Sequence, residues 1–457
     1  MSDRERDSLA GRASRYARVG AGVGGAAARI AGARLFGRDL TDARNAADLA
    51  ATLGDLKGPL MKIAQLLGTI PDLVPPEFAA EMQKLQAEAP PMGAAFVRRR
   101  MKAELGADWR DRFADFDMTP AAAASLGQVH RARLHDGRDV AVKLQYPAMA
   151  SAVEADLSQL GVLLSVQRRF SPELDTSEVG EELAERLREE LDYAREARNI
   201  ALYRDMLAGE ASIRVPEAVP ELSSPRLLTM TWLDGSRLLD HVERPLAERN
   251  RIAAAMFRAW WMPFFRYGVI HADPHLGNYT VFEEEGRPHG LNLLDFGAVR
   301  VFPPGFVGGV IELYEGFRND DRERIAGAYR KWGFRDVTDD LIDTLNIWAR
   351  FIYSPLLDDR VRSMADGVSP QDYGRREVYQ VQQRLKALGT VTIPREFVFM
   401  DRAAIGLGAV MLHLKAEMNF HRLFADLIAG FDERELADRQ QTALAAAGLH
   451  PAAGAAG

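Results

Sequence analysis

The stretch GVIHADPHLGNYTVFEEEGRPHGLNLLDFG, residues 268–297, decides the fold because it carries two motifs with the spacing that phosphoryl transfer requires. The first is His271-Ala272-Asp273, with Asn278 five residues after the aspartate, and the second is Asp295-Phe296-Gly297. In such sites one aspartate lies near the attacking oxygen, while an asparagine and a second aspartate hold Mg²⁺ against the phosphates. We therefore assign Asp273 to catalysis, and Asn278 and Asp295 to metal binding.

The segment between the two motifs predicts a β-hairpin. Residues 280–284 and 290–294 are typical of short strands, and residues 286–289 contain the glycine and proline of a turn. Any one of these tripeptides recurs by chance in unrelated loops. Their occurrence together, in this order and on a hairpin, favours a kinase-type site.

The composition excludes several classes of function. At 457 residues the chain has room for two or three domains, and its 47% hydrophobic and 27% charged content is that of an ordinary globular protein. A net charge of −7 gives no electrostatic reason to bind nucleic acid. The absence of cysteine excludes disulfides and thiolate chemistry. No apolar run is long enough to span a bilayer, so we expect a cytoplasmic protein, with a peripheral position at the inner membrane as the alternative.

Residues 1–40 differ from the rest of the chain. They hold eight arginines and four acidic residues, which makes this part locally basic. Gly20, Gly22 and Gly25 match the dinucleotide fingerprint G-x-G-x-x-G, but no strand precedes them, so the match is accidental. Two interpretations stay open, a flexible arm and an amphipathic segment on anionic lipid, and the glycines favour the arm.

Beyond residue 113 the sequence predicts a nucleotide-binding sheet. The kinase glycine loop G-x-G-x-x-G-x-V is matched here by Ala122-x-Ala124-x-x-Gly127-x-Val129, and Lys143 follows the valine by the expected 14 residues. A lysine at the end of the strand Val140-Ala141-Val142 needs an anionic partner, which in this frame is the nucleotide phosphates and a glutamate. The residues that we expect to bind nucleotide are Ala121, Ala122, Ala123, Ala124, Ser125, Gly127, Val129 and Lys143.

Spacing alone does not identify the glutamate that accompanies Lys143. Glu154 lies at a usual separation on the next predicted helix. A later helical pattern offers Glu190, Asp192 and Glu196, and the last two lie one turn apart on one face.

The remaining segments outline a second, helical part. Residues 213–215 and 226–231 are predicted to complete a five-stranded antiparallel sheet, and residues 232–235 to form the hinge between two lobes. Residues 248–267 predict a helix that packs Trp260 beneath the catalytic loop. Residues 305–435 are predicted to be mainly helical, with helices at 341–353 and 402–420, and the tail from residue 443 to be disordered.

Together these residues resemble the UbiB/AarF/ADCK family of atypical kinases over roughly residues 50–435. The resemblance rests on four segments: the alanine run 121–124, Lys62-Ile63-Ala64-Gln65 in place of a K-x-G-Q helix, Glu190-Leu191-Asp192 in place of an E-x-D pair, and the loop 271–278. In the family the helix αC glutamate follows the E-x-D pair, which implies Glu196 as the partner of Lys143. Ala64 replaces the motif glycine, so only Lys62 and Gln65 are carried over.

The resemblance implies an α+β, two-lobed protein-kinase-like fold with an N-terminal helical extension. Its domains would be a basic arm at 1–40, the extension at 41–105, a sheet lobe at 106–235, a helical lobe at 236–442 and a tail at 443–457. Lys62, Gln65, Glu190 and Asp192 would then regulate access to the site.

The resemblance also implies the cofactors ATP or ADP and Mg²⁺. It implies ATPase activity or small-molecule phosphorylation that supports ubiquinone or isoprenoid-lipid metabolism, with a quinone precursor or an isoprenoid lipid as the partner. After Asp295-Phe296-Gly297 there is neither a long activation segment nor an A-P-E motif, which disfavours a conventional protein kinase.

Two rival functions stay open. An aminoglycoside-type or other small-molecule phosphotransferase shares the loop motif but has no need of the segment around Lys62 and Gln65. A nucleotide-binding pseudokinase scaffold usually lacks at least one of Lys143, Asp273, Asn278 and Asp295, all of which are present here. The sequence predicts no oligomeric state.

Overall fold

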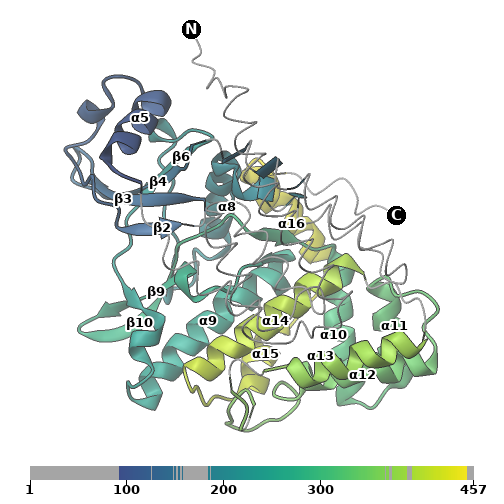
Figure 1. Cartoon of the computed structure of the whole chain (residues 1–457). Coiled ribbons are helices and arrows are strands. Elements are labelled where there is room, and N and C mark those ends of the chain that lie inside the picture. Colours follow the sequence, from purple (N-terminus) through teal and green to yellow (C-terminus); the bar gives the residue numbers. More distant parts are fainter. Residues whose placement is uncertain are drawn as a thin grey trace, which may run out of the picture. The chain divides into compact units, whose positions relative to one another are not determined.

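The computed structural model describes residues 92–449, with gaps at 125, 148, 151–152, 155–156, 158–183, 186, 366, 370–372 and 389–393. The basic arm, most of the helical extension with Lys62 and Gln65, and Ser125 lie outside the described residues. The chain divides into two compact units (Figure 1). The first contains residues up to Ala194 together with Pro220–Thr229, and the second contains Arg195–Val219 and the chain from Met230 onward.

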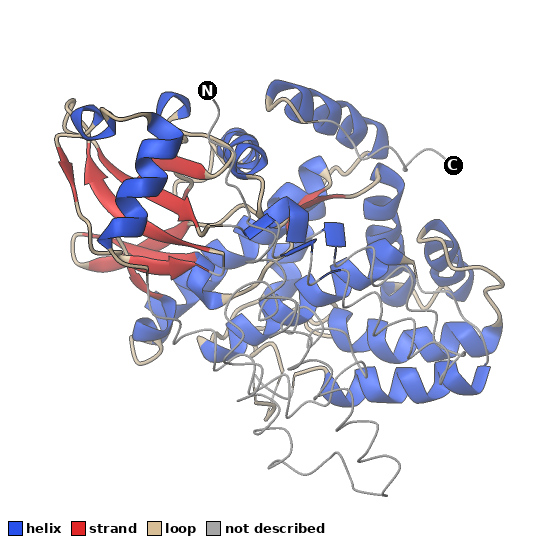
Figure 2. Ribbon diagram, turned by 45° about the horizontal axis from the view of Figure 1, so that its top comes forward, coloured by secondary structure: helices blue, strands red, loops and turns tan. Residues whose placement is uncertain are grey.

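The first unit is built on a five-stranded sheet, drawn in red in Figure 2. Its strand β4 buries the β-branched residues Val140 and Val142, which suit a pleated surface. The order is β1-β3-β4-β6, and β2 pairs with β3. The bounds are β1 Asp115–Phe116, β2 Ala122–Ala124, β3 Gly127–Arg133, β4 Asp139–Gln145 and β6 Leu227–Thr231.

Helix α5, Ala94–Leu105, is attached to the end of β4 by a buried arginine. The Arg100 guanidinium donates to the main-chain oxygens of Gln145 at 3.0 Å and Tyr146 at 3.2 Å. It also pairs with Glu104 at 3.1 Å, so the buried charge has a partner on its own helix. A short 3-10 helix, Trp109–Arg112, connects α5 to the sheet.

The prediction that residues 213–215 join this sheet is wrong. Strand β5, Ile213–Arg214, pairs in parallel with β10, Arg287–Leu293, in a four-stranded sheet of the second unit. Gly290 makes the pairing possible, because a Cβ atom there would lie 2.8 Å from Ser212 Cα and closer still to its carbonyl oxygen. A two-residue strand carries no sequence signal for its partner, and this partner is about 80 residues distant.

The hairpin between the two motifs forms, but its turn lies earlier than predicted. Strands β9, Tyr279–Glu284, and β10 pair antiparallel, and the turn is Glu285-Gly286. Both residues have positive φ, 52° and 74°, as the tight turns of β-hairpins require. The register shifts between Pro288 and Gly290, where a proline inside the strand leaves the ladder irregular. Strand β7, Ser236–Arg237, completes the sheet order β5-β10-β9-β7.

Helices form most of the second unit, as expected. The predicted helix at 402–420 instead begins after Pro394 and ends at His413, and α15 starts separately at Phe420. The described helices of this part are α8 Tyr193–Met206, α9 Leu246–Tyr267, α10 Pro304–Arg318, α11 Arg322–Lys331, α12 Asp339–Tyr353, α13 Arg375–Leu388, α14 Arg395–His413, α15 Phe420–Ile428 and α16 Glu433–Ala446. None of the helices in the described part of the chain is both long enough and apolar enough to cross a membrane.

The prediction of a disordered tail from residue 443 is wrong for its first residues. Ala443 and Leu444 belong to α16 and are buried. The Gln440 side chain of the same helix donates to the main-chain oxygens of Tyr267 at 2.8 Å and Phe302 at 2.9 Å. Alanine-rich composition suggested disorder, but alanine also favours a helix once one face of it is buried.

A buried histidine in the first unit makes stability depend on pH. His130 is fully buried, its Nδ1 lies 2.9 Å from Asp117 O, and its Nε2 lies 2.9 Å from Gln128 Nε2. A carbonyl can only accept, so Nδ1 carries the proton and Nε2 accepts. Burial lowers the pKa of His130 below 6.5, the ordinary value for histidine. At acidic pH this histidine is therefore protonated more readily in the unfolded chain than in the folded chain. The free energy of unfolding consequently falls as pH drops below about 6.5.

We accordingly predict that the free energy of unfolding decreases between pH 7.5 and pH 5.5 less steeply for His130→Gln than for the wild type. Glutamine keeps a donor and an acceptor but does not titrate in this range. Urea denaturation at five pH values measures both slopes. Equal slopes would show that His130 does not contribute to the pH dependence.

Candidate active site

The catalytic loop begins where α9 ends. Gly268, at a φ of 64°, terminates the helix and turns the chain into β8, Val269–His271. Strand β8 pairs antiparallel with β11, Val299–Val301, so that His271 lies opposite Val299. This pairing places the first motif beside the chain that follows the second motif.

His271 connects the two motifs directly. It is buried, and its Nε2 lies 2.5 Å from the main-chain oxygen of Asp295. Nε2 must be the donor in this contact, and Nδ1 accepts from Asp273 N at 3.4 Å. The histidine is thus a neutral structural bridge between the catalytic loop and Asp295, a role that the sequence analysis did not assign.

Asp273 and Asn278 are held by a chain of hydrogen bonds that starts in α9. Trp260 Nε1 donates to the Tyr279 hydroxyl at 3.1 Å, which donates in turn to Asp273 O at 3.1 Å. Asn278 Nδ2 donates to the same carbonyl at 3.4 Å. Burial, with a smaller contribution from the Asp273 charge, raises the pKa of Tyr279 well above its usual value, so the hydroxyl keeps its proton and remains a donor. The predicted packing of Trp260 beneath the loop is confirmed.

Two side chains of helix α8 hold the main chain of Phe296 in the second motif, one through its nitrogen and one through its oxygen. Glu196 Oε1 accepts from Phe296 N at 3.4 Å, and Asn199 Nδ2 donates to Phe296 O at 2.8 Å. The two residues lie one helical turn apart and therefore share a face. Both are buried, as is the Phe296 ring, which packs against Tyr203 with a centroid distance of 5.2 Å. Asn199 was not predicted.

Of the acidic residues that spacing left open, Glu154 and Glu196 lie in different surroundings in the structure. Glu154 is exposed and forms an ion pair with Arg188 at 2.6 Å in the first unit. Glu196 is 2% exposed and contacts the second motif in the second unit. Of these two, Glu196 is the one that contacts the second motif, and its pairing with Lys143 stays a prediction.

The donor set fits a hard cation that also binds phosphate. Asn278 uses its amide nitrogen on Asp273 O, which leaves the amide oxygen as its remaining metal-binding atom. Leu294 N donates to Asn278 O at 3.0 Å, and this bond places Asn278 beside the residue that precedes Asp295. The described residues hold no group of three or more histidine, cysteine or acidic side chains suited to a metal ion. Mg²⁺ commonly needs only one or two carboxylates, because phosphates and water complete its shell.

Of the residues predicted to bind nucleotide, Ala122–Ala124, Gly127 and Val129 lie on the β2–β3 hairpin of the first unit, and Lys143 lies on β4. Strands β2 and β3 pair tightly, and Ala121 N donates to Val129 O at 2.8 Å. Val129 is in turn the cross-strand partner of Lys143. Gly127 is required by the sheet, because a Cβ atom there would collide with the main-chain oxygen of Leu144 and lie 2.9 Å from the Tyr193 hydroxyl. The third position of the glycine loop thus has a packing role here.

Strand β4 bears Lys143 and also contacts the acidic stretch that precedes α8. Lys143 is 8% exposed, and its Nζ lies 5.1 Å from the centroid of the Tyr193 ring. Gln145, two residues further on and on the same face of β4, donates to Leu191 O at 3.0 Å. Leu191 is the middle residue of Glu190-Leu191-Asp192, so Gln145 fixes this stretch to the strand that bears the lysine. Gln145 was also not predicted.

We predict that Asn199→Leu lowers the melting temperature and loosens the second motif. The substitution leaves Phe296 O without its 2.8 Å partner in a buried position, which typically costs about 1–3 kcal/mol. For a chain of 457 residues that corresponds to about 1–3 °C. Ile405→Leu, a substitution at a half-buried position of α14, serves as the matched control. An unchanged melting temperature for Asn199→Leu, measured by calorimetry, would show that the hydrogen bond from Asn199 to Phe296 O does not stabilise the second motif.

Comparison with known proteins decides the family. The sequence profile described as "ABC1 atypical kinase-like domain" matches residues 84–329, which is more than half of the chain. This chain belongs to the ABC1 atypical kinase-like family. The resemblance to UbiB/AarF/ADCK proteins is thereby confirmed, as is the α+β protein-kinase-like fold class. The matched region includes every site residue described above, from the β2–β3 hairpin to Asp295.

The curated relatives are longer proteins. The chain is 35% identical over 294 residues to "Atypical kinase coq-8, mitochondrial" of Caenorhabditis elegans, covering 64% of this chain and 39% of that protein. It is 33% identical over 343 residues to "Atypical kinase COQ8B, mitochondrial" of Rattus norvegicus, covering 71% and 64%. Among solved structures, Rv3197 of Mycobacterium tuberculosis in complex with erythromycin matches with a TM-score of 0.60 and 29% identity, covering 85% of this chain and 96% of that one.

Proposed function

We propose that this chain is a Mg²⁺-dependent enzyme that binds ATP and transfers or hydrolyses its terminal phosphoryl group. The observation that carries the proposal is the connection of Asp273 and Asn278 with Asp295 through His271, Trp260 and α8. Phosphoryl transfer depends mainly on such positioning and on charge, so a site held this firmly supports catalysis over a scaffold function. When bound, Mg²⁺ would supply the positive charge that offsets the negative charge of the phosphates.

Each residue has a defined role in the proposed reaction. Asp273 receives the proton of the attacking hydroxyl or water, and its Oδ1 is oriented by His275 N at 3.2 Å. Asn278 and Asp295 would supply the oxygen atoms that hold the metal ion, and the Asp295 carboxylate is oriented by Gly297 N at 3.0 Å. Lys143 would supply positive charge to the nucleotide phosphates.

The short connection after the second motif supports a substrate other than protein. Only Ala298 separates Gly297 from β11, and only Phe302 and Pro303 separate β11 from α10. Conventional protein kinases use the chain between these points to dock a peptide. The second unit has no such segment, so we propose a quinone precursor or an isoprenoid lipid as the acceptor, reached at the surface of a membrane.

Radiolabelled ATP distinguishes the possible acceptors. The purified chain is incubated with [γ-³²P]ATP and, in separate reactions, a quinone-precursor phenol, anionic vesicles, casein or erythromycin. We expect label in inorganic phosphate or in the phenol or lipid fraction, and none of it with Asp273→Asn. Label on erythromycin would favour the small-molecule phosphotransferase, an alternative that the erythromycin complex of Rv3197 makes worth testing. Label on casein would overturn the exclusion of protein substrates.

A further inference from the structure

Helix α14 contains two glycines, Gly406 and Gly408, that its backbone conformation does not require. Neither residue has a positive φ, and both lie inside a helix of 19 residues. Glycine in the interior of a helix is less favourable than alanine, so these two positions need another explanation. In each case the explanation is a neighbouring residue that leaves no room for a side chain.

Gly406 lies against the residue that follows Asp273. A Cβ atom on Gly406 would be 2.5 Å from Pro274 Cβ and closer still to Pro274 Cγ. The proline ring is joined to the main chain at both ends, so it cannot swing aside as a long side chain would. The backbone of α14 therefore packs directly on the catalytic loop.

Pro274 in turn restricts the main chain of Asp273. A residue before proline is confined mainly to extended conformations, because it would otherwise collide with the proline Cδ. The main-chain oxygen of Asp273 accepts from the Tyr279 hydroxyl at 3.1 Å and from Asn278 Nδ2 at 3.4 Å. The main chain of Asp273 is thus held by hydrogen bonds within the loop and by the packing of the next residue on α14.

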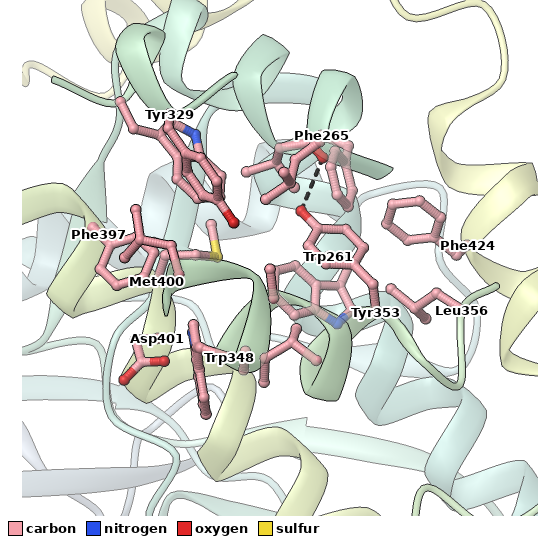
Figure 3. A pocket seen from close by; sticks show the side chains of 17 residues that line it. Trp261, Phe265, Tyr329, Trp348, Tyr353, Leu356, Phe397, Met400, Asp401 and Phe424 are labelled. Carbon is pink, nitrogen blue, oxygen red and sulfur yellow. Dashed lines mark hydrogen bonds between the residues drawn. The ribbon is translucent and has the colours of Figure 1, made fainter. Parts of the chain in front are cut away.

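The first turns of α14 are fixed by aromatic packing. The centroid of the Phe397 ring lies 5.4 Å from that of Phe334 and 5.5 Å from that of Trp332. Figure 3 shows Phe397 and Met400 of α14 among the aromatic side chains of this core. Close packing of this kind leaves the start of the helix little freedom to shift.

The last turn of α14 is fixed by an arginine of α9. The Arg249 guanidinium donates to the main-chain oxygens of Leu414 at 2.9 Å and Lys415 at 2.7 Å. Carbonyl groups at the end of a helix have no partner within it, so Arg249 supplies one. Because both ends of α14 are held, a side chain added at Gly406 would displace the loop more readily than the helix.

We propose that Gly406 is a positioning residue for Asp273, because its lack of a side chain lets α14 pack on Pro274 and fix the catalytic loop. Gly406 acts through Pro274 and not on the substrate. The expected effect on turnover rests on the proposed function, whereas the packing itself does not. A displacement of about 1 Å at a reacting group can lower a rate by about 10²-fold.

Gly406→Ala is the test variant, and two other glycine-to-alanine substitutions are its controls. Gly408→Ala is in the same helix, and its Cβ atom would be 2.6 Å from Tyr373 Cζ. That collision is of the same kind but involves a residue outside the catalytic loop. Gly327→Ala in α11 meets no atom within 4 Å, so it reports the intrinsic effect of replacing a helical glycine.

We expect Gly406→Ala to lower kcat for ADP release by at least about tenfold while KM for ATP stays within about threefold. Gly408→Ala should lower the melting temperature and keep kcat within about twofold of the wild type. Gly327→Ala should keep kcat and melt no lower than the wild type. An unchanged kcat in Gly406→Ala, or an equal loss of kcat in Gly408→Ala, would overturn the positioning role.

A double variant tests whether the contact with Pro274 is the cause. Pro274→Gly removes the ring that the new methyl group would meet, and by itself it should lower kcat because it frees Asp273. In this background Gly406→Ala should cost at least about fivefold less in kcat than in the wild type. Equal costs in the two backgrounds would overturn the contact as the cause. If Gly406→Ala alone does not fold, folding of the double variant supports the contact, and failure of both contradicts it.

Hydrogen exchange of the peptide that spans residues 269–280 measures the loop without turnover. Amides of this peptide are hydrogen-bonded within the loop, including Asn278 N to His275 O at 3.0 Å, so their exchange reports loop opening. Exchange should be faster in Gly406→Ala than in the wild type, and unchanged in Gly408→Ala. Faster exchange without ATP turnover by the wild type would count against the proposed function and leave the packing role standing. Equal exchange in Gly406→Ala and the wild type would overturn the packing role.

Discussion

Asp273→Asn is expected to lower ATP turnover by about 10²–10⁴-fold, the usual contribution of a positioned proton acceptor. The effect should be on chemistry and not on the fold. Asp273 Oδ1 accepts from His275 N at 3.2 Å, and an asparagine oxygen in the same place can accept that bond. The main-chain oxygen of Asp273, which anchors Tyr279 and Asn278, is unaffected by the substitution.

Steady-state ADP release and nucleotide titration measure the two effects separately. We expect the affinity for MgADP to stay within about threefold of the wild type, since the residue acts on the attacking group. Asp320→Asn is the control, because Asp320 is exposed and its φ of 54° is one that asparagine accepts. Turnover within a factor of two of the wild type would remove Asp273 from the catalytic role.

Asp295→Asn is expected to remove the Mg²⁺-dependent part of nucleotide binding. The asparagine oxygen can still accept the hydrogen bond from Gly297 N, which is 3.0 Å long in the wild type. The main-chain oxygen can still accept the hydrogen bond from His271 Nε2. What is lost is the negative charge that holds the metal ion, and we expect MgADP to bind about 100-fold more weakly or worse.

Thermal shift with ADP, at increasing Mg²⁺ concentrations, measures this loss. The wild type should gain stability as Mg²⁺ is added, because a ligand that binds only the folded state stabilises it. Asp295→Asn should show the same small shift with and without Mg²⁺, while Asp320→Asn behaves as the wild type. A full Mg²⁺-dependent shift in Asp295→Asn would place the metal on other residues.

The sequence predicts the polar and charged residues of the candidate site from local spacing, and the catalytic and metal-binding roles given to them stay predictions. Asp273, Asn278 and Asp295 lie within one 30-residue stretch, and Lys143 follows its hairpin at a fixed distance. Periodicity likewise located α9 and the β3–β4 pair, because the apolar residues of their buried faces recur at regular spacing. Features that depend on residues close together in the sequence can be predicted from the sequence alone.

The residues that hold these charges in place were mostly missed, for a different physical reason. Asn199 contacts Phe296 across 97 residues of sequence, and Gln145 contacts Leu191 across 46. A neutral polar side chain carries no signal of its partner, because the same residue types occur on exposed surfaces. Strand β5 was assigned to the wrong sheet for the same reason. Its pairing with β10 depends on the absence of a side chain at Gly290, which is distant in the sequence.

The domain boundaries at 40, 105, 235 and 442 stay predictions, although the division into units differs from them in one respect. Residues 195–219, which include Glu196 and Asn199, group with the second unit and not with the sheet of the first. The contacts of these residues with Phe296 explain the grouping, because they tie α8 to the second motif. Helical periodicity identifies such a helix but does not reveal which unit its buried face joins.

The measurement that tests the central claim most directly is ADP release from ATP by the purified wild-type chain as Mg²⁺ is titrated from zero to millimolar concentration. If Asp273, Asn278 and Asp295 form a phosphoryl-transfer centre, release is absent without Mg²⁺, rises and saturates as Mg²⁺ is added, and is lost in Asp273→Asn while Asp320→Asn retains it. Release at the same rate without Mg²⁺, or in Asp273→Asn, would contradict the account.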